Sequence, residues 1–271
     1  MARNGKRMRK PVQVESEPGI PAATLILFSR PDSRAAARHL MIQRSAKMRF
    51  AANALVFPGG RVDEDDHVVA TDHELIAATP ADPAELAHRV TAIRETLEEA
   101  GILAGARARL TGSDIAALQD GLKSGSPFSR LLRDAGVRLD LSALVLWAEW
   151  HPKLESNRRF DTRFYIARHE GDLATRSDAD ETCQALWLSA ENALHEAGAG
   201  TAKVLFPTLR NLERLAAYPT FEAAKAHVET VEARPISTYI EEDEQGEKWV
   251  CIPPDSGYPV TRQLWVELLA P

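Results

Sequence analysis

The chain has 271 residues, which suits one large domain, and 33 Lys and Arg against 39 Asp and Glu give a formal charge of −6. With 44% hydrophobic and 27% charged residues, the composition excludes wholesale disorder and disfavours a nucleic-acid binder that relies on bulk positive charge. The longest apolar runs, at 22–28 and 141–148, are far shorter than the roughly 20 residues of a membrane span, so no membrane partner is expected.

The sequence of the N-terminus and the spacing of the cysteines indicate the cellular location. Residues 1–20 begin with a basic stretch, but glutamates and Pro18 follow it where a secretion signal would be apolar. We therefore expect a flexible basic N-terminus and no secretion. Cys183 and Cys251 fit neither a metal motif nor a disulfide framework. The chain also ends without a peroxisomal signal. A reducing, cytoplasmic location is the expectation.

Short apolar runs bounded by Pro and Gly predict the strands, in chain order, at 22–28, 38–43, 54–57, 141–147, 160–167 and 185–188. The run at 54–57 stops at Pro58-Gly59-Gly60. Residues 61–83 are acidic and contain two prolines, which predicts mostly loop.

Helical periodicity is clearest over 84–101, where Leu86, Val90, Ile93 and Leu97 form one apolar stripe and Gly101 supplies the stop. Further helices are predicted at 190–196, 203–217 and 220–233, and two short ones within 113–135, split near 121–127. Residues 236–240 and 248–252 predict a terminal hairpin over an acidic turn. Strands and helices alternate without a composition break, so one α/β domain over 21–271 is favoured.

The helix at 84–101 carries three carboxylates, Glu95, Glu98 and Glu99, on the side opposite its apolar stripe. Such a cluster repels itself when no cation is present, and hard anionic oxygens are the ligands that Mg²⁺ and Mn²⁺ prefer. Arg94 can hold one carboxylate in place. Taken alone, the pattern is also typical of the solvent face of an amphipathic helix.

Three features follow one another along the chain: the strand end Phe57-Pro58-Gly59-Gly60, an acidic loop, and the run from Arg94 to Ile102. Together they resemble the Nudix hydrolase family. The signature of that family is G-x5-E-x7-R-E-U-x-E-E-x-G-U, where U is an aliphatic residue. Gly60 and the helical half match. Three departures stand out. Asp66 occupies the position of the first glutamate, Thr96 replaces an aliphatic residue, and residues 67–93 number 27 where seven are usual.

The resemblance implies a Nudix-type α/β/α sandwich with a mixed sheet. Two additions to this sandwich are expected. One is an insertion at about 67–83, and the other is a helical and C-terminal elaboration at about 190–271 that ends in the hairpin. The resemblance further implies a hydrolase in which Glu95, Glu98, Glu99 and the Gly59 carbonyl bind Mg²⁺ or Mn²⁺. Gly60 would let the backbone approach the substrate closely, and Arg94 would orient a glutamate.

The catalytic base is left open. Glu95 is one candidate, and Glu149 and Asp161 are weaker ones that we expect to be solvated or salt-bridged instead. Arg158, Arg159 and Arg163 could face the site or lie on the surface of an edge strand. Trp147, Trp150 and Trp187 are expected in the core.

A finer resemblance concerns the residues before the box. A series of segments resembles the element that precedes the box in coenzyme A diphosphatases: Leu40 to Ser45, then Arg49, then Phe57 to Gly60. Ile42 and Asn53 differ from the residues of that element. This resemblance implies that Arg44 and Arg49 bind substrate phosphate, although both could instead pair with the acidic loop at 63–66.

The expected substrate is therefore a small molecule, coenzyme A or acyl-CoA, cleaved to 3′,5′-ADP and (acyl-)phosphopantetheine. The alternatives are the same chemistry on ADP-ribose, a dinucleotide or a capped RNA, and a non-catalytic ligand-binding module on the same fold. The acidic balance disfavours nucleic acid in general, and the sequence leaves the oligomeric state open.

Overall fold

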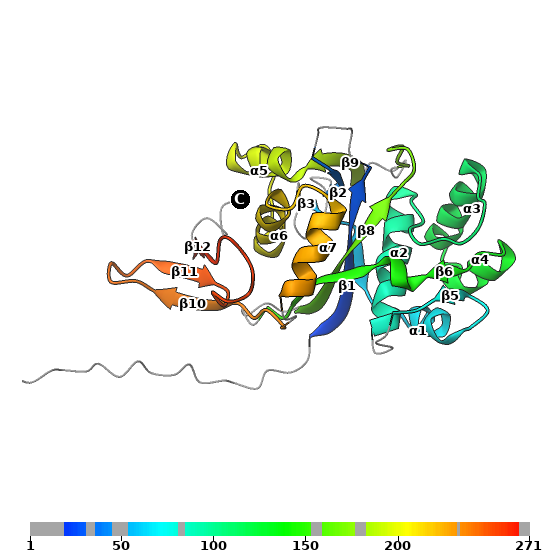
Figure 1. Ribbon diagram of the computed structural model, residues 1–271, viewed down its shortest axis with the longest axis horizontal. Helices are drawn as coiled ribbons and strands as arrows, with labels where there is room; N and C mark the ends of the chain where they lie inside the picture. The colour runs from blue at the N-terminus through cyan, green and yellow to red at the C-terminus, as the bar shows by residue number, and fades with distance from the viewer. Residues whose placement is uncertain are drawn as a thin grey trace, which may run out of the picture.

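A mixed β-sheet forms the centre of the computed structural model, which describes residues 19–30, 36–44, 54–80, 85–152, 159–176, 183–231 and 234–265 (Figure 1). Its seven strands are β1 (Ile20–Ser29), β2 (Arg38–Arg44), β3 (Leu55–Val56), β4 (Gly59–Arg61), β7 (Val145–Trp150), β8 (Phe160–His169) and β9 (Cys183–Ser189). The order is β3-β2-β1-β8-β7, with β4 paired to β1 and β9 to β2. β1 and β8 run parallel and the other pairs antiparallel, which confirms the predicted mixed sheet.

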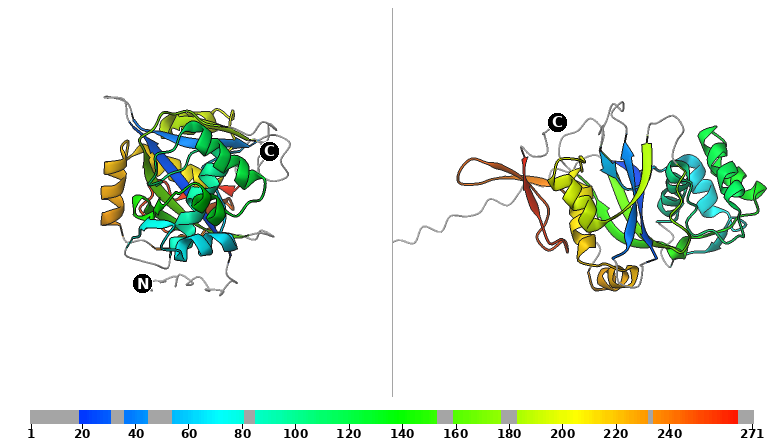
Figure 2. Two further views of the ribbon diagram at one scale, coloured as in Figure 1. Left: turned by 90° about the vertical axis from the view of Figure 1, so that its right-hand side faces the viewer. Right: turned by 90° about the horizontal axis from the view of Figure 1, so that it is seen from above.

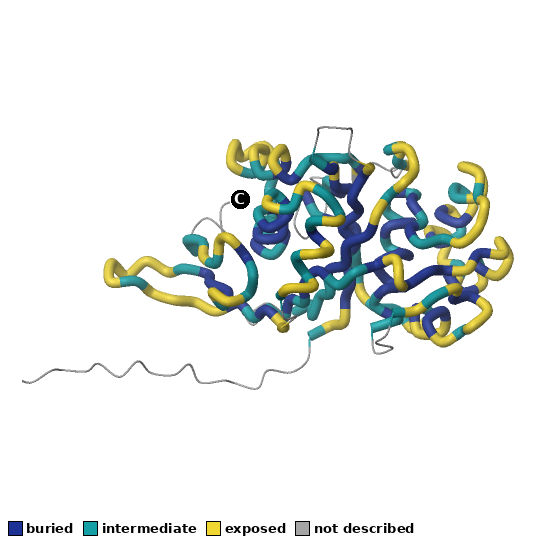
Figure 3. Tube along the Cα trace, viewed as in Figure 1, coloured by how far each residue is buried: buried dark blue, intermediate teal, exposed yellow. Residues whose placement is uncertain are grey.

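Helices cover both faces of this sheet (Figure 2). Helix α2 (Leu86–Ala100) packs on one face, and α5 (Ala190–Gly198), α6 (Phe206–Ala216) and α7 (Phe221–Thr230) pack on the other. Because side chains alternate along a strand, Leu25 and Leu27 of β1 enter the α2 core, whereas Ile26 and Phe28 enter the opposite one. Both faces are therefore buried, as Figure 3 shows, and the predicted α/β/α sandwich is confirmed.

The remaining helices and the C-terminal hairpin agree with the sequence patterns. The segment 113–135 forms two helices, α3 (Gly112–Lys123) and α4 (Phe128–Asp134). The hairpin pairs β10 (Tyr239–Glu242) with β11 (Lys248–Cys251), and β12 (Arg262–Leu264) adds a third antiparallel strand.

The prediction that 61–83 is mostly loop was wrong, because it contains helix α1 (Glu64–Thr71) and strand β5 (Ile76–Ala78), which pairs with β6 (Leu139–Asp140). A capping box between Asp63 and Asp66 starts α1, and Val69 is buried in the α2 core. Local composition favoured loop, but packing against α2 stabilises a helix here.

Two further expectations need correction. The strand predicted at 141–147 begins only at Val145, because a short 3₁₀ turn (Leu141–Ala143) precedes it and the Asp140 side chain accepts a hydrogen bond from the Ser142 N–H. The strand that carries Arg163 is not an edge strand, since β8 lies between β1 and β7. Arg158 lies outside the described residues.

Several expectations stay predictions. The flexible N-terminus falls almost wholly outside the described part of the chain, and the extent of a single domain over 21–271 is untested. Within the described residues, no helix combines the length and apolar character that a bilayer crossing requires.

Candidate active site

Helix α2 positions the candidate metal ligands on the sheet. Val90, Ile93 and Leu97 of its apolar stripe are completely buried, and Leu86 is partly buried. The helix ends at Gly101, whose φ of 68° is left-handed and whose N–H bonds to the Leu97 carbonyl at 2.9 Å. The last two turns therefore carry Glu95, Glu98 and Glu99, on a helix that contacts β1 and β4.

The Pro-Gly-Gly strand end meets two of these glutamates. Gly59 and Gly60 form β4 and pair with Thr24 and Ala23 of β1. The Gly59 N–H donates to Glu99 Oε2 at 3.2 Å. A Cβ on Gly60 would lie only 2.4 Å from Glu95 Oε1, so glycine is required for Glu95 to occupy this place.

Arg94 connects helix α1 to the site. It is only 6% exposed, and its guanidinium donates to both carboxylate oxygens of Asp66, at 2.9 and 3.0 Å. It also donates to Glu95 Oε1 at 2.8 Å and to the Arg61 carbonyl at 3.1 Å. Arg94 therefore fixes the orientation of Glu95, in the arrangement that the resemblance implied.

Asp66 is the positioning residue whose role the sequence interpretation missed. It is completely buried and accepts further hydrogen bonds from the Thr91 hydroxyl at 2.7 Å and from the Asp63 N–H at 3.0 Å. The signal was present, because Asp66 occupies the first acidic position of the motif. Its partner Arg94 lies 28 residues further along the chain, and only the fold brings the two together.

Burial disfavours the charged forms of the two inner glutamates. It raises the pKa of Glu95 to about 7, against the opposing effect of Arg94. Burial and then the neighbouring Glu95 raise the pKa of Glu99 to about 8, while the Gly59 N–H and Arg44 oppose the rise. A divalent cation at this point would reverse the local sign and favour both carboxylates as anions.

The donor set fits a hard divalent cation. The Glu98 side chain is 39% exposed and extends toward solvent. Its Oε2 atom lies 3.6 Å from a guanidinium nitrogen of Arg94. Across the described part of the chain, no three acidic, histidine or cysteine side chains converge closely enough to form a complete cage. Mg²⁺ does not need one, because it commonly uses one or two carboxylates and retains water or substrate oxygens.

Arg44 lies beside the glutamates. It ends β2, close enough to Glu99 to lower the pKa of that carboxyl, and its buried Nε has no hydrogen-bond partner among the described residues. It forms no ion pair there with the acidic segment at 63–66, the alternative that the sequence left open. Arg49 lies outside the described residues.

The weaker candidates have other partners. Glu149 accepts from His151 at 2.8 Å and from Arg163 at 3.5 Å, and Asp161 accepts from the Gly19 N–H at 2.8 Å. These contacts agree with the expectation that both carboxylates are engaged rather than free. Trp147 and Trp150 are buried, whereas Trp187 is partly buried and stacks on His169.

A cavity lies beside Glu98. It has a volume of about 520 Å³ and opens between the start of α1 and the turn from α3 to α4, and both Arg94 and Glu98 line it. The N–H and hydroxyl of Ser129 at the start of α4 donate to Asp65, which ties α4 to α1. Of the insertion at about 67–83, Val68 lines this cavity.

An α/β/α sandwich with an Arg-Glu-x-x-Glu-Glu-x-Gly helix closed over a Pro-Gly-Gly strand end defines a Nudix-type hydrolase. The family model described as the NUDT19 Nudix domain matches residues 67–215, more than half of the chain, and the chain belongs to the Nudix hydrolase family.

Relatives and solved structures agree with this assignment. The chain is 25% identical over 223 residues to acyl-coenzyme A diphosphatase NUDT19 of Xenopus laevis, covering 65% of this chain and 59% of that protein. It is 27% identical over 208 residues to the Gallus gallus protein of the same name, covering 57% and 54%. The match thus spans less than two thirds of these curated relatives. A crystal structure of a Nudix hydrolase from Alicyclobacillus acidocaldarius is 29% identical, with a TM-score of 0.65, and covers 77% of this chain and 96% of that one.

Proposed function

We propose that the protein is a Mg²⁺- or Mn²⁺-dependent pyrophosphohydrolase that cleaves coenzyme A or acyl-CoA to 3′,5′-ADP and (acyl-)phosphopantetheine. The observation that carries this proposal is the pair of partly buried glutamates, Glu95 and Glu99, held against Gly60 and Gly59, with Glu95 oriented through Arg94. Without a cation, the charged forms of these two carboxylates are disfavoured. This property fits a site that functions with a cation bound.

The residues have separate roles in this account. Glu95, Glu98, Glu99 and the Gly59 carbonyl would hold the metal, which supplies charge stabilisation of the phosphoryl oxygens and a more acidic bound water. Arg94 holds Glu95 in orientation, and Asp66 holds Arg94. Gly60 leaves room for Glu95 and for the close approach of substrate. Hydrolysis adds water across the P–O–P linkage, so each product keeps one phosphate of the original pair.

Two observations support the coenzyme A class. The curated relatives from Xenopus laevis and Gallus gallus are named acyl-coenzyme A diphosphatases. Arg44, from the upstream element, presents a guanidinium beside Glu99 with its Nε unpartnered among the described residues. Guanidinium groups suit phosphate, and coenzyme A carries a 3′-phosphate in addition to its pyrophosphate.

A second candidate is the same reaction on another nucleoside diphosphate derivative, such as ADP-ribose, a dinucleotide or a capped RNA. Ile42 and Asn53 favour it, because both depart from the coenzyme A element. A non-catalytic module is disfavoured because all three box glutamates are present.

A substrate panel separates these candidates. The purified protein is incubated with coenzyme A, an acyl-CoA, ADP-ribose, a diadenosine polyphosphate and NADH, each with Mg²⁺, with Mn²⁺ and with chelator, and products are identified by mass. We expect metal-dependent 3′,5′-ADP from the CoA compounds. AMP from another substrate, with the CoA compounds intact, would contradict the substrate assignment. Absence of any product from folded protein would favour the binding module.

A further inference from the structure

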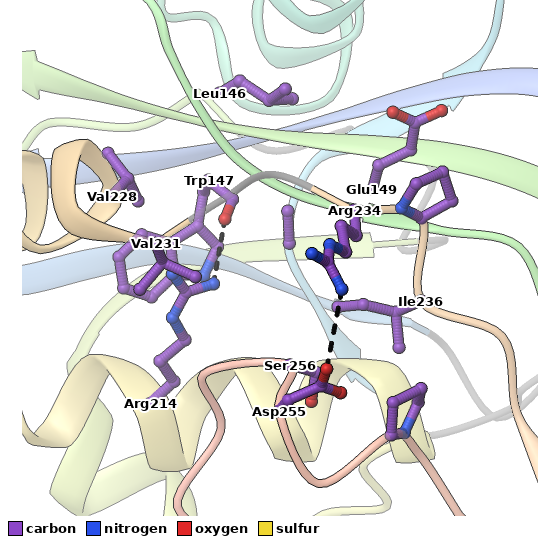
Figure 4. A pocket seen from close by; sticks show the side chains of 13 residues that line it. Leu146, Trp147, Glu149, Arg214, Val228, Val231, Arg234, Ile236, Asp255 and Ser256 are labelled. Atoms are coloured by element: carbon purple, nitrogen blue, oxygen red, sulfur yellow. Dashed lines mark hydrogen bonds and ion pairs between the residues drawn. The ribbon is translucent and has the colours of Figure 1, made fainter.

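A second cavity, of about 210 Å³, lies on the sheet face that α5–α7 cover (Figure 4). Strand β7, helices α6 and α7 and the turn at 253–256 contribute to its wall. None of its lining residues belongs to the metal box or to the cavity beside Glu98. An apolar cavity of roughly 150 Å³ is enough to hold benzene, so this space suits a small organic molecule.

Arg214 of α6 places a positive charge in this wall. The residue is 3% exposed, and its guanidinium lies over the Trp147 ring, 3.8 Å from the ring centroid. It donates to the Trp147 carbonyl at 2.9 Å and to His227 Nε2 at 3.2 Å, and it also hydrogen-bonds to the Tyr258 side chain. None of these partners supplies a negative charge, because burial lowers the pKa of His227 and raises that of the Tyr258 phenol. Among the described residues, no carboxylate lies within ion-pair distance of Arg214. Buried charges usually have a counter-ion.

The acidic groups of the wall are used elsewhere. Glu149 contacts His151 and Arg163, and Asp255 lies 3.7 Å from Arg234. Their charges therefore do not balance that of Arg214.

A second polar group in the wall lacks a partner. The Ser256 hydroxyl is buried and has no hydrogen-bond partner in the described part of the chain. Buried polar atoms are usually hydrogen-bonded, so an unpartnered one in a cavity wall points to an absent ligand. The remaining surface is largely apolar and includes Val228, Val231, Ile236 and Pro253.

We propose that this cavity is a binding site for a small amphipathic anion, a carboxylate or phosphate monoester on a short apolar chain. The oxyanion would pair with Arg214 and accept from the Ser256 hydroxyl, and the chain would pack on Val228 and Val231. The site is separate from the metal box, so the inference does not depend on the proposed hydrolase substrate.

Ligand-detected NMR titration of the full-length protein in Tris–chloride buffer, without nucleotide or divalent metal, tests this inference. The probes are hexanoate, monobutyl phosphate and hexan-1-ol, the last providing an apolar chain without charge. We expect at least one anion to saturate the protein below about 10 mM. Hexan-1-ol should bind at least roughly tenfold more weakly, because it leaves Arg214 uncompensated. The two anions distinguish a carboxylate ligand from a phosphate one.

Three variants assign any binding to this cavity. Arg214→Gln removes the charge, Ser256→Ala removes the unpartnered hydroxyl, and Val228→Phe fills the space while leaving Arg214 in place. Each should weaken anion binding, Val228→Phe and Arg214→Gln by at least roughly tenfold. Val260→Phe makes the same change as Val228→Phe at a residue that is 38% exposed and does not line the cavity, and should bind like wild type.

Val228→Phe and Ser256→Ala keep the test decisive if Arg214→Gln does not fold. The inference is overturned by any of three results: no saturation by either anion, hexan-1-ol binding as tightly as the anions, or anion binding unchanged in folded Val228→Phe.

Discussion

Asp66 and Arg94 form a buried pair in which both carboxylate oxygens accept from one guanidinium, at 2.9 and 3.0 Å. Asp66 is completely buried and Arg94 is 6% exposed. Because Arg94 also donates to Glu95, the pair connects helix α1 directly to a candidate metal ligand. The aspartate that replaces the family's glutamate therefore retains a partner for the motif arginine.

Replacing Asp66 by Asn should destabilise the protein and reduce turnover. The amide removes the negative charge that balances Arg94 and places N–H groups against donors. Breaking a buried pair in this way costs about 3–5 kcal/mol. Urea unfolding measures the loss, and kcat with Mg²⁺ should fall because Glu95 is no longer held. Arg61→Ala is the control, because the Arg61–Asp63 pair has side chains 73% and 42% exposed and should change stability by about 0.5 kcal/mol or less. Equal stability of the Asn variant and wild type would contradict this role of Asp66.

Replacing Gly60 by Ala should impair catalysis with little effect on backbone strain. The new methyl group would lie 2.4 Å from Glu95 Oε1, so the carboxylate must move away from its place beside Arg94. We expect kcat to fall by roughly tenfold or more, since small displacements of positioned groups are costly. Gly198→Ala, at the end of α5 with no atom within 4 Å of the added methyl group, should leave kcat unchanged. Normal turnover by Gly60→Ala would show that Glu95 does not need its observed position.

The metal-free protein should become less stable as pH rises from about 4.5 to about 8. Glu95 and Glu99 have folded-state pKa values of about 7 and about 8, above their ordinary 4.5, so the folded state binds more protons in this interval. The stabilisation is complete below 4.5 and is lost as pH passes through the raised values. At about 1.4 kcal/mol per pKa unit, the loss for the pair together should be at most roughly 8 kcal/mol.

Thermal unfolding at several pH values, with chelator or with Mg²⁺, measures this dependence. Mg²⁺ should restore stability mainly at the alkaline end, where the carboxylates are charged. Glu99→Gln should reduce both the pH dependence and the Mg²⁺ effect. If the Glu99→Gln protein had the same pH profile and the same Mg²⁺ response as wild type, the metal would have to bind elsewhere.

Arg44→Ala should discriminate between coenzyme A and dephospho-coenzyme A, which lacks the 3′-phosphate. If Arg44 binds that phosphate, kcat/KM for coenzyme A should fall roughly tenfold or more, and that for dephospho-coenzyme A much less. Arg38→Ala, at the exposed start of the same strand, is the matched control and should leave both values unchanged. Equal losses for the two substrates in Arg44→Ala would exclude a contact with the 3′-phosphate.

Local patterns were sufficient to predict the elements that hold the site. The spacing of Val90, Ile93 and Leu97 predicted α2, and Gly101 predicted its end, because helix periodicity and a left-handed stop are encoded within a few residues. The two-sided burial of β1 likewise follows from an apolar run at 22–28 that only Thr24 interrupts.

Contacts between distant segments could not be predicted in the same way. The segment that forms helix α1 was predicted as loop, because the acidic residues of its first turn were not interpreted as a capping box. The stability of this helix also depends on the burial of Val69 against α2. The role of Asp66 depends on Arg94, and the charge state of Glu99 depends on burial and on Glu95, which the Gly59 N–H and Arg44 oppose. These relationships arise from the fold rather than from neighbouring sequence, and they determine the chemistry of the site.

One measurement compares the wild-type protein with the Glu98→Gln/Glu99→Gln double variant, with coenzyme A as substrate and mass detection of products. We expect wild type to release 3′,5′-ADP with Mg²⁺ or Mn²⁺ and none with chelator. The double variant should be slower by roughly a thousandfold, while unfolding at the same temperature as wild type or higher, because neighbouring like charges have been removed. Normal turnover by the folded double variant, or turnover that persists in chelator, would contradict the proposed function.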